Sequence, residues 1–342
     1  MGITIVDVAK RAGVTISTVS YTLSGKRPVS EQARARVLQA IEELHYQPHA
    51  LGQALRSKRT YTIGFLYPTL ADGLSSLQLE FIEGASAVTM ERNYGLYLWS
   101  GQDQDQGVMQ LMQRGFIEGV ILLEIRMKDP RIAFLKERGY PFVMIGHGPD
   151  NSPENDGTSF VDLDFVAALR TSVEYLAELG HQDIAFLNIS TSMTLGAAYA
   201  IRATQSFEQS IARLGLQGQT YPCPPDSQKG YELVRSILEE KPTLTGIITI
   251  NSWVVGSILR AVQERDLRIP EDFSVVTMLP SHLAEMMHPT LTSIDFPYRE
   301  IGRIAAEMLI RKLDEPHALP TQTLLQVPLS IRQSTGPYKP RG

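Results

Sequence analysis

Residues 4 to 20 read Thr4-Ile5-Val6-Asp7-Val8-Ala9-Lys10-Arg11-Ala12-Gly13-Val14-Thr15-Ile16-Ser17-Thr18-Val19-Ser20, a pattern of two short amphipathic helices that meet at a glycine. Thr4 and Asp7 have the spacing of a capping box, and Thr15 can cap the second helix. The first sixty residues hold nine Lys or Arg and four Asp or Glu, although the whole chain has a net charge of −5. Basic charge beside a helix-turn-helix pattern indicates a phosphate backbone as the partner.

The basic segment continues into a third helix, which Ser30 can begin. This helix carries an apolar stripe: Ala33, Val37, Ile41 and Leu44. The sequence therefore predicts a helix-turn-helix domain over residues 1–47. Residues 48–59 form a linker with helical potential, but this segment is too short for a stable isolated helix. We expect it to become ordered only when something docks it.

From Tyr61 onward, apolar segments of strand length alternate with amphipathic helical patterns. The expected strands are Thr62 to Tyr67, Leu96 to Ser100, Gly119 to Leu123, Phe142 to Ile145, Asp183 to Leu187, Gly246 to Ile250 and Phe273 to Met278. The expected helices are Leu77 to Arg92, Phe165 to Leu179, Ser206 to Leu214, Gly230 to Glu239, Val254 to Asp266 and Tyr298 to Leu313. Such alternation predicts parallel sheets covered on both faces.

The fold class expected for residues 60–342 is α/β, with two doubly wound lobes and a cleft between them. One lobe is expected to combine approximately residues 60–160 and 280–297. The other is expected to combine residues 163–278 and 298–335. A (β/α)₈ barrel is the alternative that periodicity alone leaves open.

Composition favours a soluble cytoplasmic protein. The hydrophobic content of 43% is sufficient for buried cores. Cys223, the one cysteine of the chain, cannot form an internal disulfide, which fits a reducing compartment. The N-terminus has no charged-then-apolar leader, and no apolar run approaches membrane-spanning length.

An enzyme is a rival hypothesis, but the sequence offers little for it. The seven His are scattered without metal-binding spacing. Ser24-Gly25-Lys26-Arg27 lacks the leading glycine of a phosphate-binding loop, and Gly146-His147-Gly148 is too short for a dinucleotide fingerprint. The sequence therefore predicts no catalytic residue, no metal and no cofactor.

Several short motifs occur in order along nearly the whole chain. They are Ile5-Val6-Asp7-Val8-Ala9-Lys10-Arg11-Ala12-Gly13-Val14, Ser17-Thr18-Val19-Ser20, Val29-Ser30, Ile41-Glu42-Glu43-Leu44, Leu179-Gly180-His181, Arg268-Ile269-Pro270-Glu271-Asp272, Pro289-Thr290-Leu291-Thr292 and Arg332-Gln333-Ser334-Thr335. As an ordered set they resemble the LacI/GalR family of bacterial transcription regulators. This resemblance implies a helix-turn-helix domain followed by a body with the type I periplasmic-binding-protein fold.

By the same resemblance, the second helix of the N-terminal domain enters the major groove of operator DNA and the linker forms a hinge helix. The implied DNA-contacting residues are Thr4, Thr15, Ile16, Ser17, Thr18, Tyr21, Ser24, His49 and Leu55. Leu55 matches a leucine that wedges into the minor groove and kinks the duplex. Tyr21 stands where the family usually has Arg, and it cannot grip guanine with two hydrogen bonds as Arg does. We therefore expect an operator that differs from the common family site at that base.

The resemblance also implies a small-molecule effector in the cleft, at the carboxyl ends of the strands. The candidate effector-binding residues are Asp72, Glu124, Arg126, His147, Asp164, Arg202, Asn251, Trp253 and Tyr298. Two departures from the family pattern weaken the expectation of a sugar. The run Thr277-Met278-Leu279-Pro280 has no carboxylate where the family commonly has Asp, and Arg202 is one residue away from the usual Arg position, here Ala203. A sugar or glycoside, or a bulkier and less hydroxylated metabolite, is expected.

The implied partners are a near-palindromic double-stranded operator and a second copy of the chain, since a two-fold site calls for a homodimer. No membrane partner is expected. The resemblance favours a repressor, and it leaves open whether the ligand releases the operator or is required for binding. A regulator of the same fold that is constitutive or controlled by a protein partner is the alternative.

Overall fold

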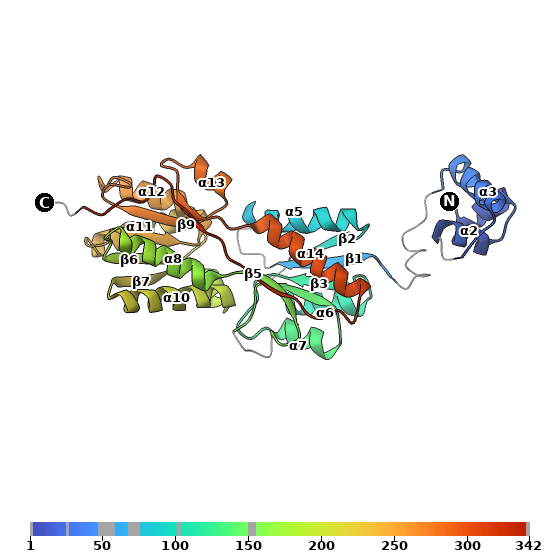
Figure 1. The fold of residues 1–342 in the computed structure, drawn as a ribbon, viewed down its shortest axis with the longest axis horizontal. Coiled ribbons are helices and arrows are strands. Elements are labelled where there is room, and N and C mark those ends of the chain that lie inside the picture. Colours follow the sequence, from blue (N-terminus) through green and yellow to red (C-terminus); the bar gives the residue numbers. More distant parts are fainter. Residues whose placement is uncertain are drawn as a thin grey trace. The chain divides into compact units, whose positions relative to one another are not determined.

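The computed structural model describes residues 3–24, 27–46, 59–67, 76–100, 104–149 and 155–339. The chain divides into two compact units, Met1–Tyr61 and Thr62–Gly342. Figure 1 shows the first as a small helical unit and the second as an α/β body. Within the described residues, no helix has both the length and the apolar character needed to cross a membrane.

The first unit is the predicted set of three helices. The capping box is present, and the backbone N–H of Thr4 donates to Asp7 Oδ2 at 2.9 Å. Gly13 has a φ of 62°, in the left-handed region, and this conformation turns the chain between the first two helices. Val8, Val19 and Val37, one from each helix, are fully buried together. The helices are α1 (Ile5–Ala12), α2 (Ile16–Ser24) and α3 (Glu31–Glu43).

The first lobe of the body is built on a six-stranded sheet in the order β11-β5-β4-β3-β1-β2, in which all neighbouring strands are parallel. Its strands are β1 (Thr62–Tyr67), β2 (Gly95–Ser100), β3 (Gly119–Leu122), β4 (Phe142–Ile145), β5 (Ser159–Leu163) and β11 (Gln322–Leu325). Its helices are α5 (Ser76–Glu91), α6 (Gln104–Gln113), α7 (Pro130–Glu137) and α14 (Tyr298–Asp314).

The second lobe has another six-stranded sheet, in the order β12-β10-β9-β8-β6-β7, where β12 alone runs antiparallel to its neighbour. Its strands are β6 (Asp183–Ile189), β7 (Gln217–Cys223), β8 (Gly246–Thr249), β9 (Ser274–Met278), β10 (Thr292–Ile294) and β12 (Leu329–Ser330). Its helices are α8 (Phe165–Glu178), α9 (Ser190–Thr194), α10 (Ala198–Leu214), α11 (Ser227–Glu240), the short 3₁₀-helix η1 (Ser252–Val254), α12 (Val255–Gln263) and α13 (Ser281–Met286).

The two-lobed α/β prediction is confirmed, and the barrel alternative is wrong because the strands form two separate sheets. The predicted division of the chain between the lobes is also wrong near the C-terminus. Residues 280–297 contain β10, which pairs with β9 in the second lobe. Residues 298–335 contain α14, which packs on β3 to β5, and β11, which pairs with β5, both in the first lobe. The chain therefore crosses between the lobes after β5, after β10 and after β11.

Helices α5 and α14 cross so closely that their backbones touch. A Cβ added at Gly84 of α5 would lie 1.9 Å from the backbone oxygen of Arg299. One added at Gly302 of α14 would lie 2.0 Å from the backbone oxygen of Phe81. Because glycine has no Cβ, this pair of positions permits the close crossing, which fixes Phe81 and Tyr298 beside each other.

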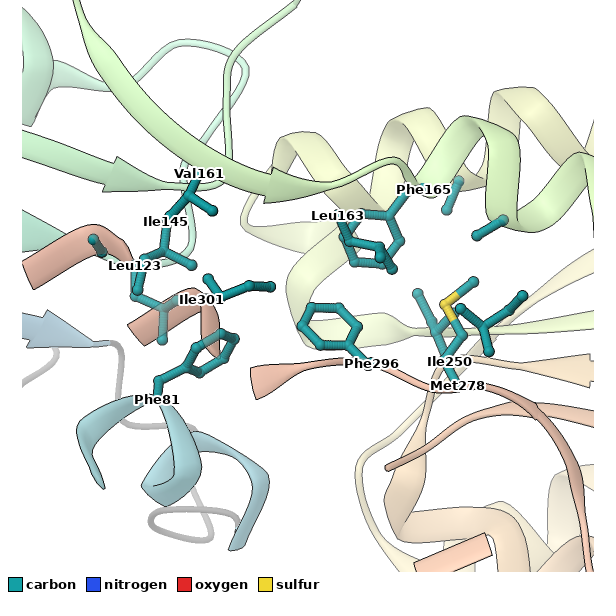
Figure 2. Packing of buried hydrophobic residues seen from close by; sticks show 14 of the residues in the cluster. Phe81, Leu123, Ile145, Val161, Leu163, Phe165, Ile250, Met278, Phe296 and Ile301 are labelled. Carbon is teal, nitrogen blue, oxygen red and sulfur yellow. The ribbon is translucent and has the colours of Figure 1, made fainter. Parts of the chain in front are cut away.

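The core of the body runs from one lobe into the other. Phe165 and Phe296 lie in the middle of this cluster, with ring centroids 5.7 Å apart. Figure 2 shows them between Phe81 on the side of the first lobe and Ile250 and Met278 on the side of the second. The interior surface next to the lobe crossings is therefore strongly apolar.

Candidate functional sites

The first turn of α2 presents a surface of small side chains in the N-terminal unit. Thr15, Ile16 and Ser17 are exposed, and Thr18 is partly buried. Thr15 Oγ1 accepts a hydrogen bond from the backbone N–H of Thr18 at 3.2 Å, so Thr15 caps the helix as predicted. An exposed, capped helix start with short side chains can approach the floor of a DNA groove closely.

Tyr21 lies one turn further along α2 and is accompanied by a cation. The guanidinium of Arg27 lies over the Tyr21 ring, 5.3 Å from its centroid. The sequence assigned Arg27 no role in DNA contact beyond its share of the basic charge of the N-terminal segment. The structure therefore places a positively charged group with several N–H donors over the ring of Tyr21, a side chain that carries no charge.

A cavity of about 930 Å³, including the part open to solvent, lies between the two lobes. Much of its wall comes from residues at or directly after the carboxyl ends of β3, β4, β6, β8 and β9, the edge where the sequence predicts the cleft. The lining residues are Leu77, Gln78, Phe81, Leu123, Glu124, Ile125, Ile145, Gly146, His147, Asp162, Phe165, Ile189, Ser192, Tyr199, Pro225, Ile250, Ser252, Trp253, Met278, Phe296 and Tyr298.

Aromatic rings make a continuous part of this wall. The rings of Phe296 and Tyr298 stack with centroids 4.0 Å apart, and Phe81 meets Tyr298 edge-on at 5.0 Å. The ring centroid of Phe165 lies 5.1 Å from that of Tyr199 and 5.7 Å from that of Phe296. These rings come from α5, α8, α10 and the segment that enters α14, so the wall joins both lobes. Sequence reasoning found only Trp253 and Tyr298 among the aromatic lining residues.

Glu124 brings a carboxyl group into the apolar cavity. Its φ is 55°, a left-handed conformation that side chains other than glycine rarely adopt. Its Oε2 is buried and has no hydrogen-bond partner among the described residues. Burial raises the pKa of Glu124 to about 7, against the opposing effects of the Arg131 charge and a hydrogen bond from Tyr199.

Asp162 also lines the cavity, but its charge is balanced by neighbouring groups. Asp162 Oδ2 lies 2.6 Å from Nη2 of Arg202 and 2.8 Å from Nδ1 of His147. Arg202 Nη1 donates to the backbone oxygens of His147 and Gly148 at 2.6 and 3.1 Å. Since Arg202 belongs to α10 and Asp162 to β5, this buried network joins the second lobe to the first.

The structure brings together some of the predicted effector residues and not others. Glu124, His147, Trp253 and Tyr298 line the cavity as predicted. Four others do not: Arg126, Asp164, Arg202 and Asn251. Each of these four side chains instead makes a hydrogen bond or an ion pair with another group of the protein.

Three of those four contacts have a clear structural purpose. Asp164 caps α8 by accepting from the backbone N–H of Ala167 at 2.9 Å. Asn251 is fully buried, donates to the backbone oxygens at the end of β7, and accepts from the backbone N–H of Trp253 at 3.2 Å. Arg126 pairs loosely with Asp129, with Nε and Oδ2 3.9 Å apart. These residues position the walls of the cavity.

Some predicted residues cannot be placed. Asp72, His49 and Leu55 lie outside the described residues, as does the side chain of Ser24. Thr4 is described, and its hydroxyl donates to Asp7 Oδ2 at 2.7 Å. Among the residues that the structure describes, no group of three or more His, Cys, Asp or Glu is arranged to hold a metal ion.

Comparison with known proteins covers both units of the chain. Residues 4–49 match the family described as bacterial regulatory proteins, lacI family, and residues 173–335 match the periplasmic binding protein-like domain. The HTH-type transcriptional regulator pepR1 of Lactobacillus delbrueckii subsp. lactis is 28% identical over 337 residues, which cover 97% of this chain and 98% of that protein.

Solved structures show the same arrangement. The transcriptional regulator CelR in complex with cellobiose has a TM-score of 0.71 and 25% identity, covering 97% of this chain and 99% of its own. The lac repressor dimer bound to operator and the anti-inducer ONPF has a TM-score of 0.86 and 22% identity, covering 98% and 100%. Residues 4–49 are thus a DNA-binding domain of the lacI type, and over nearly its whole length this chain is similar to bacterial transcription regulators of the LacI family.

Proposed function

We propose that this protein is a transcription regulator, most simply a repressor, that binds operator DNA through α2 and changes its operator affinity when a small molecule occupies the cavity. The observation that carries the proposal is the combination of an exposed, capped α2 with a large cavity between two lobes. The proposal is supported by the sequence similarity of a transcriptional regulator over 97% of this chain.

The DNA-binding part rests on the face of α2. Ile16, Ser17 and Thr18 are short enough to let the helix enter the major groove, and Tyr21 with Arg27 forms a planar, charged group one turn later. A near-palindromic operator is read by two such units, so we propose that the protein acts as a homodimer in the cytoplasm. The lac repressor is a dimer in its operator complex.

The switch rests on the cavity walls. Because residues of both lobes line the cavity, a ligand that contacts both favours one angle between them over others. We propose that this angle controls the linker between the units and, through it, the ordering of a hinge helix in which Leu55 wedges into the minor groove. Leu55→Ala is then expected to weaken operator binding and abolish DNA bending, while leaving the thermal stability of the body unchanged.

The experiment begins with DNA, because the operator sequence is unknown. Full-length protein is used to select duplexes from a randomised library, and the best duplex is measured by fluorescence anisotropy against random competitor at moderate salt. The expected result is a near-palindromic site bound at least a hundredfold more tightly than competitor. Absence of any selected sequence, with or without a metabolite extract, would overturn the proposal.

The same assay tests the effector. Addition of a metabolite fraction is expected to change operator affinity at least fivefold in one direction, and that direction distinguishes induction from corepression. An effect that survives removal of small molecules by dialysis but not protease treatment would favour the alternative of control by a protein partner. Chemical conversion of the metabolite during the assay would instead favour an enzyme.

A further inference from the structure

We propose that the effector of this cavity carries a protonated amine, which pairs with the Glu124 carboxylate while the rest of the ligand lies against the aromatic wall. The inference rests on the proposed function in one respect, that the cavity between the lobes is the effector site. It goes further by naming the chemical group that the site selects.

The first argument is the charge balance of the cavity and its surroundings. Asp162 is compensated by Arg202, and Asp129 behind the wall is compensated by Arg131 at 2.6 Å. Glu124 has no such ion pair among the described residues, and its Oε2 has no hydrogen-bond donor. Arg131, whose charge lowers the pKa of Glu124, is already paired with Asp129. A buried carboxylate without a counter-charge of its own is costly, so the positive charge is best supplied by the ligand.

The second argument is the aromatic wall. The faces of Phe, Tyr and Trp rings are electron-rich and attract ligand cations, most strongly where water is excluded. Phe81, Phe296 and Tyr298 are packed into one group, and Trp253 stands at a more exposed part of the lining. An ammonium group beside such rings and a carboxylate gains from both, whereas a hydroxyl gains little from the rings.

The third argument is the backbone at Glu124. The left-handed φ of 55° is an unfavourable conformation for glutamate, and it is kept at the point where the chain leaves β3 and enters the cavity wall. The groups that face the carboxyl are Arg131 from α7, Tyr199 from α10 and Tyr298 from α14. Burial raises the pKa of both tyrosines, so at neutral pH they offer hydroxyl groups and no second negative charge.

The test compares amines with alcohols of the same shape. Tyramine and tyrosol differ only in an ammonium or hydroxyl at the end of the same arm, as do tryptamine and tryptophol. Binding of these four compounds and of cellobiose to the full-length protein, without DNA, is measured by ligand-observed NMR and calorimetry at pH 8. Each amine is expected to bind at least tenfold more tightly than its alcohol and more tightly than cellobiose.

Variants at Glu124 assign the effect. Glu124→Gln is expected to remove the preference for amines, bringing each pair within about twofold, whereas Glu124→Asp retains part of it. Glu91→Gln, the same change on an exposed carboxylate of α5, is the matched control and is expected to change nothing. Thermal melts of each variant confirm that the protein is folded.

The outcomes separate this inference from the proposed function. Alcohols or cellobiose that bind as tightly as the amines, no detectable amine binding, or an amine preference that survives in Glu124→Gln would each overturn the inference. If the protein then selects a specific duplex and a neutral metabolite releases it, the proposed function as a transcription regulator stands, and its effector belongs to another chemical class. If no duplex is selected but the amines still bind, the proposed function as a transcription regulator is wrong, and the proposed amine-binding site at Glu124 stands.

Discussion

Glu124 should determine much of the pH dependence of the body's stability. Its pKa is about 7 in the folded protein against 4.5 for an ordinary glutamate. Below pH 4.5 Glu124 is protonated in both the folded and the unfolded protein, so it does not reduce the free energy of unfolding. As the pH rises through this interval, the unfolded chain loses the proton first, so folding becomes less favourable, and the full cost is present above about 7.

The first prediction follows from this sign. Glu124→Gln removes the charge and is expected to be more stable than the parent at pH 8, by on the order of 3 kcal/mol, with little difference near pH 4. Urea unfolding of the full chain across this pH range measures the difference. Glu91→Gln should follow the parent curve, and a Glu124→Gln curve parallel to the parent would contradict the assigned pKa.

Arg27 is the residue that should compensate for the absence of arginine at position 21. Because its guanidinium lies over the Tyr21 ring, the two side chains are expected to act as one unit at the DNA. Arg27→Ala is predicted to weaken operator binding by about 1–2 kcal/mol, and Arg27→Lys to recover only part, since an ammonium cannot stack as a plane.

A double-mutant cycle with Tyr21→Ala checks this second prediction by anisotropy at two salt concentrations. The combined loss is expected to be clearly smaller than the sum of the single losses. Arg34→Ala, which removes the same charge from the exposed face of α3, is the control. If Arg34→Ala and Arg27→Ala show equal losses and equal, additive behaviour with Tyr21→Ala, Arg27 contributes only general electrostatic attraction.

The sequence predicted the place of the cavity better than its lining. Glu124 and His147 follow buried strands directly, so the topological rule for parallel sheets locates them. Phe81 and Phe165 occur in amphipathic helix patterns, where a core residue and a cavity residue look alike, and Phe296 lies between the predicted elements. Only the packing of α5, α8 and α14 around the lobe crossings separates the two roles, and that packing has no local signature.

At the scale of elements, the crossing of α5 and α14 holds the aromatic wall in place. A methyl group at Gly302 would meet the backbone oxygen of Phe81 at 2.0 Å, and backbone cannot rotate away as a side chain does. Gly302→Ala must therefore push the helices apart, together with the Phe81–Tyr298 contact that they carry. The third prediction is a loss of about 3 kcal/mol in the free energy of unfolding, with weaker effector binding.

Gly256 of α12 gives the matched control. It also lies in a helix and is exposed, but a Cβ added there meets nothing within 4 Å. Gly256→Ala is expected to stabilise the protein by about 0.5–1 kcal/mol, because alanine is the better helix former. Equal effects of the two substitutions in urea unfolding would show that the α5–α14 crossing adapts without cost.

Element prediction failed mainly where strands are short or solvent-facing. β10 has three residues and β12 has two, too few for a periodic pattern. β7 is largely exposed along Gln217–Thr220, at the edge of its sheet, and reads as polar loop. Buried strands such as β1 and β4 were predicted with the observed bounds. The lobe to which α14 belongs depends on which of the two sheets it packs against. That packing involves residues far apart in the sequence, and helix periodicity does not predict it.

At the scale of the whole body, the lobes are joined by more than the three chain crossings. The backbone N–H of Ala198 donates to the oxygen of Ile125 at 2.8 Å, and the N–H of Met127 donates to the oxygen of Gly196 at 2.9 Å. The buried Arg202–Asp162 pair adds a side-chain contact between the lobes. A ligand that changes the angle between the lobes must break or strain these contacts. Their free energy therefore limits how far ligand binding shifts the equilibrium between lobe angles.

The last prediction measures that strength. Arg202 and Arg213 both belong to α10, but Arg202 pairs with Asp162 while buried, whereas Arg213 pairs with Glu174 of α8 while both side chains are largely exposed. Double-mutant cycles by urea unfolding, with Arg→Met and the acid→amide change, are expected to give a coupling of about 3 kcal/mol for the buried pair and below about 1 kcal/mol for the exposed one. Couplings of equal size would mean that solvent reaches the Arg202–Asp162 pair, and that the lobes open there without effector.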